Sequence, residues 1–272
     1  MTKREYAQEI ANAVNGKVME VAKANGIIHT GINVPSQKSK VSPTVYIDEY
    51  YEQSREIEEA VEMVKTMIEK NRVDDFDVTQ ITDFSKVKEN LRARLYSDRT
   101  QAEVFRTTDC MDGLIVVPYI RLKNDEFGGY ASVKVTRQIL QNWDVSEDEV
   151  FRIAYENSAK DVKFVNMAYM MAEMMGLPVE VAEAMAGDNE MYVLSNSDKM
   201  FGAIGALVAR EMLKERFPDG YVILPSSVHE VIVLPYTAGM DTDCLNEMVK
   251  EVNMQEVLPE EVLGDRAYVF AA

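Results

Sequence analysis

Residues 191–235 read MYVLSNSDKMFGAIGALVAREMLKERFPDGYVILPSSVHEVIVLP, and this stretch decides the fold. An apolar run predicts a strand over 191–194, and apolar residues at three-to-four spacing then predict a helix over 198–217. Pro218-Asp219-Gly220 ends that helix. Two β-rich runs, 221–224 and 228–234, are joined by Pro-Ser-Ser and predict a pair of strands. The stretch is therefore a helix packed on a hairpin.

The rest of the chain repeats this alternation of strand pairs and helices. Apolar spacing, capping residues and turn residues predict helices over 3–24, 52–71, 83–95, 136–142, 146–158, 162–175, 178–186 and 242–253. They predict strands over 27–34, 41–48, 76–82, 114–122, 130–135 and 267–270. We expect an α+β fold in which mixed or antiparallel sheets of strand pairs pack against helices. It forms one domain over 1–272, with 159–190 as a helical insert or subdomain.

The charge balance narrows the classes of partner. The chain of 272 residues carries 46 acidic and 29 basic residues, a net charge of −17. Such a surface repels phosphate backbones, so we expect protein partners and no direct binding of nucleic acid. The apolar runs are far shorter than the roughly 20 residues of a membrane span, and no signal peptide is expected at the N-terminus. Cys110 and Cys244 stand alone in the sequence, which favours two free thiols and a cytoplasmic location. The sequence does not predict an oligomeric state.

The Pro-Ser-Ser turn holds the candidate catalytic residues Ser226, Ser227 and His229. If 228–234 is a strand, side-chain alternation places His229 on the opposite face from Glu230, so these two side chains cannot cooperate. A Ser–His contact at the turn is geometrically allowed. A hydrolase or transferase built here predicts a concave pocket at the turn and a carboxylate from elsewhere within reach of the imidazole. The alternative is a buried, hydrogen-bonded turn.

A basic run stands out in this acidic chain and gives the candidate binding residues Lys86, Lys88, Arg92 and Arg94. On the predicted helix 83–95 these side chains would dock an acidic partner or the protein's own acidic surface. The alternative is a solvated helix face.

Metal and cofactor motifs are missing from the sequence. The aspartates at 74, 75, 77 and 83, and those at 241 and 243, lack the glycine and terminal glutamate of an EF-hand loop, so they predict solvated loops. Gly202 and Gly205 lie inside a predicted helix and not at a strand-to-helix turn, which predicts close packing and not a phosphate loop. The methionines of 162–175 predict core filling or an adaptable binding surface. We therefore expect neither a metal nor a cofactor.

Several stretches resemble one family of uncharacterised bacterial proteins, a domain of unknown function common in anaerobic gut bacteria and their mobile elements. They are SPTVYIDEYY (42–51), DFDVTQITDFSKVK (75–88), NWDVSEDEVFRIAYENS (142–158), MYVLSNSDKMFGA (191–203) and YVILPSSVHEVIVLP (221–235). A fainter resemblance, in 143–157 and the C-terminal strands, is to a second uncharacterised bacterial family. Where members of the first family often carry a basic pair, this chain has Thr107-Thr108-Asp109-Cys110, which weakens the case for shared catalysis there. The resemblance implies a cytoplasmic bacterial protein and no mechanism.

Two functions follow as expectations. The first is a non-enzymatic binding or accessory protein that acts through protein contacts. One version of it is an acidic decoy for a nucleic-acid-binding partner, which requires the carboxylates to gather on one face. The second is a small hydrolase or transferase that uses the Pro-Ser-Ser-Val-His turn.

Overall fold

The computed structural model describes residues 1–35, 42–71, 76–124, 129–187 and 190–272. It confirms an α+β fold with antiparallel sheets. The three expected strand pairs are confirmed, each as antiparallel neighbours. Within the described part of the chain, no helix has both the length and the apolar character needed to span a bilayer.

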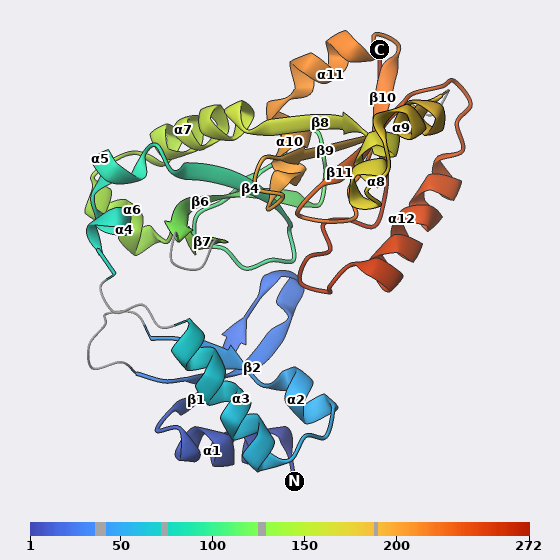
Figure 1. The fold of residues 1–272 in the computed structure, drawn as a ribbon. Coiled ribbons are helices and arrows are strands. Elements are labelled where there is room, and N and C mark those ends of the chain that lie inside the picture. Colours follow the sequence, from blue (N-terminus) through green and yellow to red (C-terminus); the bar gives the residue numbers. More distant parts are fainter. Residues whose placement is uncertain (36–41, 72–75, 125–128, 188–189) are drawn as a thin grey trace.

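The N-terminal residues form a body with its own hydrophobic core, drawn in blue and cyan in Figure 1. A small sheet of order β1-β2-β3 packs against α1 and α3 around Ile10, Ile32 and Val64. The elements of this body are α1 (Lys3–Ala13), β1 (Lys17–Ala22), η1 (Ala24–Gly26), β2 (Ile28–Asn33), β3 (Thr44–Tyr46), α2 (Asp48–Glu52) and α3 (Ile57–Lys70).

The predicted helix 3–24 is wrong beyond Ala13. Asn15 adopts a left-handed conformation with φ 55°, and the chain turns there. A side chain at Gly16 would meet Ile32 Cγ2 at 2.8 Å, so only glycine allows the returning strand to lie so close. Residues 17–22 then pair with β2, and Asn25-Gly26 form the tip of a hairpin and not the end of a helix.

The middle of the chain forms a sheet in which β6 pairs with β4, β5 and β7. One face of this sheet packs against α7, which begins at the predicted cap Ser146. The elements are α4 (Thr79–Thr82), α5 (Phe84–Val87), β4 (Leu91–Ser97), β5 (Arg106–Thr107), β6 (Leu114–Asn124), β7 (Gly129–Lys134), α6 (Arg137–Trp143) and α7 (Glu147–Lys160).

Two predictions in this region are wrong. The predicted strand 76–82 is instead the short helix α4. The predicted helix 83–95 ends at Val87, and the strand β4 follows. In β4, Leu91, Ala93 and Leu95 alternate with polar and aromatic residues and are fully buried, which is the period of a strand.

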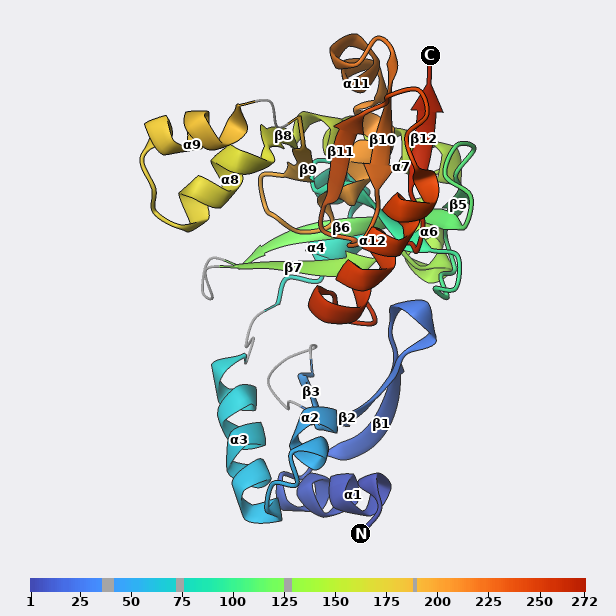
Figure 2. The same ribbon diagram turned by 90° about the vertical axis from the view of Figure 1, so that its right-hand side faces the viewer.

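The C-terminal part forms a third sheet, of order β12-β10-β11-β9-β8. Figure 2 shows α8 and α9 projecting from the end of this sheet, next to its edge strand β8. The elements are β8 (Val162–Asn166), α8 (Met167–Met174), α9 (Val179–Ala186), β9 (Tyr192–Asn196), η2 (Gly202–Ile204), α10 (Gly205–Val208), α11 (Arg210–Arg216), β10 (Gly220–Leu224), β11 (Val231–Pro235), α12 (Thr242–Glu256) and β12 (Tyr268–Ala271).

The long helices predicted in this part are interrupted. Residues 162–166 leave the predicted helix 162–175 to pair with β9, because their alternating burial suits a sheet edge. The predicted helix 198–217 is broken into η2, α10 and α11. Its first residues form a turn in which Phe201 is left-handed, with φ 57°. β11 starts at Val231, so His229 lies in a bend before the strand and the predicted alternation of His229 with Glu230 is wrong.

Candidate functional site

The middle sheet has one strongly polar face. The register sets Arg92 of β4 opposite Tyr119 of β6, and Tyr119 opposite Lys134 of β7. Because alternate residues of a strand share a face, Arg94 and Arg121 lie on this same face. The opposite face carries Leu91, Ala93 and Leu95 toward α7. An acidic protein thus gathers three arginines and a lysine on one side of one sheet.

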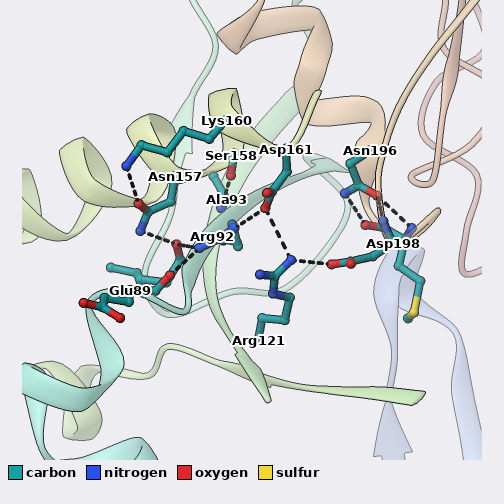
Figure 3. A network of polar contacts seen from close by, with 12 residues as sticks. Glu89, Arg92, Ala93, Arg121, Asn157, Ser158, Lys160, Asp161, Asn196 and Asp198 are labelled. Atoms are coloured by element: carbon teal, nitrogen blue, oxygen red, sulfur yellow. Dashed lines mark hydrogen bonds and ion pairs between the residues drawn. The ribbon is translucent and has the colours of Figure 1, made fainter. Parts of the chain in front are cut away.

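Two of these arginines are neutralised by carboxylates, as Figure 3 shows. Arg92 Nε lies 2.7 Å from Asp161 Oδ2, and Arg121 Nη1 lies 2.6 Å from Asp198 Oδ2 and 3.3 Å from Asp161 Oδ2. Burial works against the charge of Arg121, but its hydrogen bond to Asp198 and the attraction of both carboxylates raise its pKa. Asn196 holds the adjacent turn by bonding Met200 at both its backbone N–H and its carbonyl.

Arg94 differs from its neighbours because it is buried and, among the residues that the structure describes, no carboxylate pairs with it. Its exposed fraction is 3%, and its Nε has no hydrogen-bond partner within the described part of the chain. Burial lowers the pKa of its guanidinium, and the groups that act in the opposite direction are the phenols of Tyr96 and Tyr119. It still carries its charge at physiological pH. A buried cation of this kind is costly unless something pairs with it.

Aromatic rings surround the Arg94 guanidinium. Its central carbon lies 5.0 Å from the ring centres of Tyr96 and Tyr119 and 4.5 Å from that of Phe201. Cation–π attraction is worth up to about 2 kcal/mol in a desolvated site, so the rings offset part of the burial cost. Burial raises the pKa of Tyr119 to about 12, so this phenol stays neutral and is no counter-ion.

Arg94 lies at the wall of a cavity of about 360 Å³. This cavity, the Arg94 pocket, is lined by Lys23, Ala24, Arg94, Tyr96, Ser132, Lys134, Met200, Phe201, Val228, His229, Glu260 and Glu261. Burial lowers the pKa of Lys134, and the nearby charges of Arg94 and Lys23 lower it further. The electrostatic environment of Lys134 is therefore positive.

The β1–β2 hairpin closes one side of the Arg94 pocket. Its tip docks on the loop after α12, where Asn25 Nδ2 donates to the carbonyls of Pro259 and Val262 at 2.8 and 2.7 Å. His29 lies between two carboxylates, with Nδ1 3.1 Å from Asp48 Oδ2 and Nε2 3.2 Å from Glu260 Oε1. The contacts of Asn25 hold the hairpin, and with it Lys23, at the pocket. The contact with His29 gives the Glu260 carboxylate a hydrogen-bond partner.

His229 is fixed at the opposite wall. Its Nδ1 accepts a hydrogen bond from the Phe201 N–H at 3.3 Å, and its Nε2 lies 3.2 Å from Glu261 Oε1. An Nδ1 that accepts an N–H bond carries no proton, so Nε2–H is the donor to Glu261. The ring stacks on Phe201 with centroids 5.5 Å apart. His229 therefore lines the pocket, and both of its ring nitrogens are hydrogen-bonded to other residues of the protein.

The structure separates the predicted catalytic residues. Ser227 Oγ accepts a hydrogen bond from the backbone N–H of His229 at 3.0 Å, so it closes a local turn and does not contact the imidazole. Ser226 uses its carbonyl to accept from Leu263 N–H. The pocket and the carboxylate that a hydrolase would require are both present, the latter as Glu261.

The predicted basic run divides among three places. Lys86 is exposed and lies 3.6 Å from Asp77 Oδ2, and Lys88 is exposed at the end of α5. Arg92 belongs to the carboxylate network, and only Arg94 lines the pocket. Sequence reasoning missed Lys23 and Lys134. The sequence did carry one signal: Arg92, Arg94 and Tyr96 alternate with apolar residues, which predicts a strand with one polar face.

The predicted aspartate clusters serve as caps. Asp83 accepts from Ser85 N–H and begins α5, and Asp241 accepts from Asp243 and Cys244 N–H and begins α12. Asp74 and Asp75 lie outside the described residues. Among the residues that the structure describes, no group of three or more histidine, cysteine, aspartate or glutamate side chains is arranged to hold a metal ion.

A larger hollow of about 970 Å³ lies between α12 and the hairpin tip. Its cations already have partners: Lys250 Nζ lies 2.8 Å from Glu247 Oε1, and Arg99 Nη2 lies 3.9 Å from Asp265 Oδ2. The larger hollow therefore offers a ligand no unpaired lysine or arginine among the residues that line it. The Arg94 pocket is the better candidate site.

Gly202 holds the Phe201–His229 wall together by close backbone contact. A Cβ there would lie 2.7 Å from Asn196 N and from His229 O, both backbone atoms that cannot give way cheaply. The predicted close approach at Gly202 is thus confirmed, but its predicted place inside a long helix is wrong, because Gly202 begins η2 directly after the turn that follows β9. We expect Gly202→Ala to lower the free energy of unfolding by about 1–3 kcal/mol, the usual range for overpacking.

Urea denaturation measures this effect. The control is Gly264→Ala, whose Cβ would meet the side-chain atom Pro225 Cγ at 3.3 Å and should cost less. Equal losses in the two variants would contradict the role of the Gly202 contact.

The comparisons with known proteins identify a family. No curated protein and no solved structure shows significant similarity to this chain. A family model matches residues 2–272, which confirms the resemblance to a domain of unknown function. The chain therefore belongs to the family of unknown function DUF5688.

Proposed function

We propose that the Arg94 pocket binds a small organic anion that carries a phosphate or carboxylate group. The observation that carries this proposal is Arg94 itself, a guanidinium at a cavity wall with an exposed fraction of 3% and no carboxylate partner among the described residues. Arginine matches phosphate and carboxylate geometry because its fork can donate two parallel hydrogen bonds. An anion in the cavity would complete this pairing.

The other charges of the pocket support an anionic ligand. Lys23 and Lys134 add positive charge near Arg94. The two carboxylates, Glu260 and Glu261, each contact a histidine at 3.2 Å. The cavity volume of about 360 Å³ lies at the lower end of the range for small-molecule sites, and Tyr96 and Phe201 give it apolar walls.

Binding accounts for the geometry better than catalysis does. A general base needs an unprotonated nitrogen that faces the substrate, whereas Nδ1 of His229 accepts the Phe201 N–H and Nε2–H donates to Glu261. Ser227 Oγ contacts backbone and not the imidazole, so no activated serine arises at the turn. These contacts argue against the hydrolase or transferase reading of the turn.

Calorimetric titration of the full chain tests the proposal. Inorganic phosphate and citrate are titrated separately, with chloride at the same ionic strength as the control for general screening. We expect saturable binding of at least one probe and a rise of the melting temperature with its concentration, because a ligand that binds the folded state stabilises it. Responses that match chloride in both arms would overturn the proposal.

Lys134 makes a specific contribution to the pH dependence of this binding. Its pKa lies below the ordinary value of 10.5 because of burial and the charges of Arg94 and Lys23. A bound anion favours the ammonium form, so affinity is full below the pKa of the free protein and falls as the pH rises through it. We expect this loss of affinity to begin below pH 10.5.

Sulfate is the probe for this prediction because its charge is constant above neutral pH. Its dissociation constant is measured from neutral pH upward for the wild type and for Lys134→Met. The variant should bind more weakly at neutral pH and show a flatter profile. An unchanged profile would exclude Lys134 as the titrating group.

A further inference from the structure

The α8–α9 hairpin exposes an unusually apolar surface. The exposed fractions are 44% for Met171, 77% for Met174 and 64% for Met175, and on α9 they are 62% for Val179 and 38% for Val181. Monomeric proteins seldom leave such side chains contiguous in solvent without a use for them. The hairpin is the part of the chain where the predicted methionine-rich surface lies open.

The hairpin holds its shape with very little burial. Its small buried side chains are Ala168, Ala172 and Ala182, where α8 and α9 contact each other. α8 also contacts β8, and Figure 2 shows both helices projecting away from the sheets. The large apolar side chains therefore point away from the protein cores, and the two helices remain a separate platform.

The charged residues in the sequence of this segment are all of one sign. Between residues 164 and 198 the chain has Glu173, Glu180, Glu183, Asp188, Glu190 and Asp198 and contains no lysine or arginine. Glu173, Glu180 and Glu183 are exposed on the two helices, beside the methionines and valines. The surface thus combines an adaptable apolar face with acidic neighbours.

We propose that the α8–α9 hairpin is a docking surface for a basic amphipathic helix of a partner protein. Methionine side chains are flexible and polarizable, so they adapt to the apolar face of such a helix. Lysine and arginine at the edges of that helix would face the hairpin glutamates. The same glutamates repel an anionic membrane and a second copy of the hairpin, so charge favours the basic helix over both.

Fluorescence anisotropy tests the proposal on the full chain. The probe is a labelled leucine–lysine peptide of about 20 residues with helical spacing, long enough to form an amphipathic helix. A leucine–glutamate peptide of the same length is the charge control. We expect the basic peptide to bind, and the acidic peptide to bind at least about tenfold more weakly.

Two sets of matched variants locate the binding. Met174→Ser, Met175→Ser and Val179→Ser together should weaken binding about tenfold or more. The matched triple change of Met248, Met254 and Leu258 to serine, on and directly after α12, should not, although these side chains are also exposed. Glu173→Gln, Glu180→Gln and Glu183→Gln together should weaken binding and its salt dependence more than the same change at Glu247, Glu251 and Glu256 of α12. Equal effects of the matched sets would overturn the proposal.

The other occupants are tested with the same serine variant. Phosphatidylserine vesicles probe a membrane, and sedimentation velocity probes self-association. If either is the interaction that the serine substitutions abolish, the basic-helix proposal is wrong. Failure of this proposal would leave anion binding at the Arg94 pocket unaffected, because the hairpin does not line that pocket.

Discussion

Arg94→Met is expected to lower the affinity for the anionic ligand at least about 30-fold while the protein stays folded. Truncating one partner of a buried, hydrogen-bonded charge pair costs about 2–5 kcal/mol, and about 1.4 kcal/mol corresponds to a factor of ten. Methionine has a similar length and makes favourable contacts with aromatic rings, so Tyr96, Tyr119 and Phe201 keep their packing. The loss should therefore fall on binding.

The stability of the same variant separates a binding residue from a structural one. Methionine loses cation–π attraction worth up to about 2 kcal/mol, but it also removes the cost of burying an unpaired guanidinium. We expect the free energy of unfolding to stay within about 1 kcal/mol of the wild type or to rise. Calorimetric titration and urea denaturation measure the two quantities.

Arg94→Lys is the companion variant. It keeps the charge but loses the planar fork, so its affinity should lie between those of the wild type and Arg94→Met. If Arg94→Met instead unfolds readily, or if it binds the anion as the wild type does, Arg94 has a structural role and the proposed function is wrong.

The sequence predicted the strand pairs well because each pair carries its own turn and its own alternating pattern. Residues 114–122 and 130–135 are an example, and they pair as β6 and β7. The error in the predicted helix 3–24 has a local cause. Short strands with apolar residues three apart, such as Val18 and Val21 in β1, also satisfy a helical period, and the contacts that decide between them come from distant parts of the chain.

The candidate site was harder to predict for the same reason. His229 and Arg94 were both singled out, but nothing in the local sequence brings them to one cavity. The pocket joins segments from Lys23 to Glu261, and its chemistry depends on which cations lack a carboxylate. Arg92 and Arg94 are two residues apart and identical in type, yet only the fold gives Asp161 to the first. Pairing of this kind is a tertiary property.

Arg121→Met is expected to cost the most stability, about 3–5 kcal/mol in the free energy of unfolding. Arg121 Nη1 lies 2.6 Å from Asp198 Oδ2, and the Asp198 side chain has an exposed fraction of 10%. Removing the guanidinium leaves this carboxylate buried without a counter-ion, which is far more costly than removing both charges. The effect on Asp161 is smaller because its carboxylate keeps a counter-ion, Arg92, whose Nε lies 2.7 Å away.

Urea denaturation of a small set of variants isolates this cause. Adding Asp198→Asn to Arg121→Met should restore part of the lost stability, because a neutral amide is cheaper to bury than an unpaired carboxylate. Arg266→Met removes an exposed arginine 3.5 Å from Asp112 and should cost no more than about 1 kcal/mol. If Arg121→Met costs no more than Arg266→Met, the carboxylates on this sheet face do not depend on their arginines. The contrast between a neutralised Arg121 and an unpaired Arg94 would then lose its energetic basis, so this measurement also tests the reasoning that assigns the pocket to an anion.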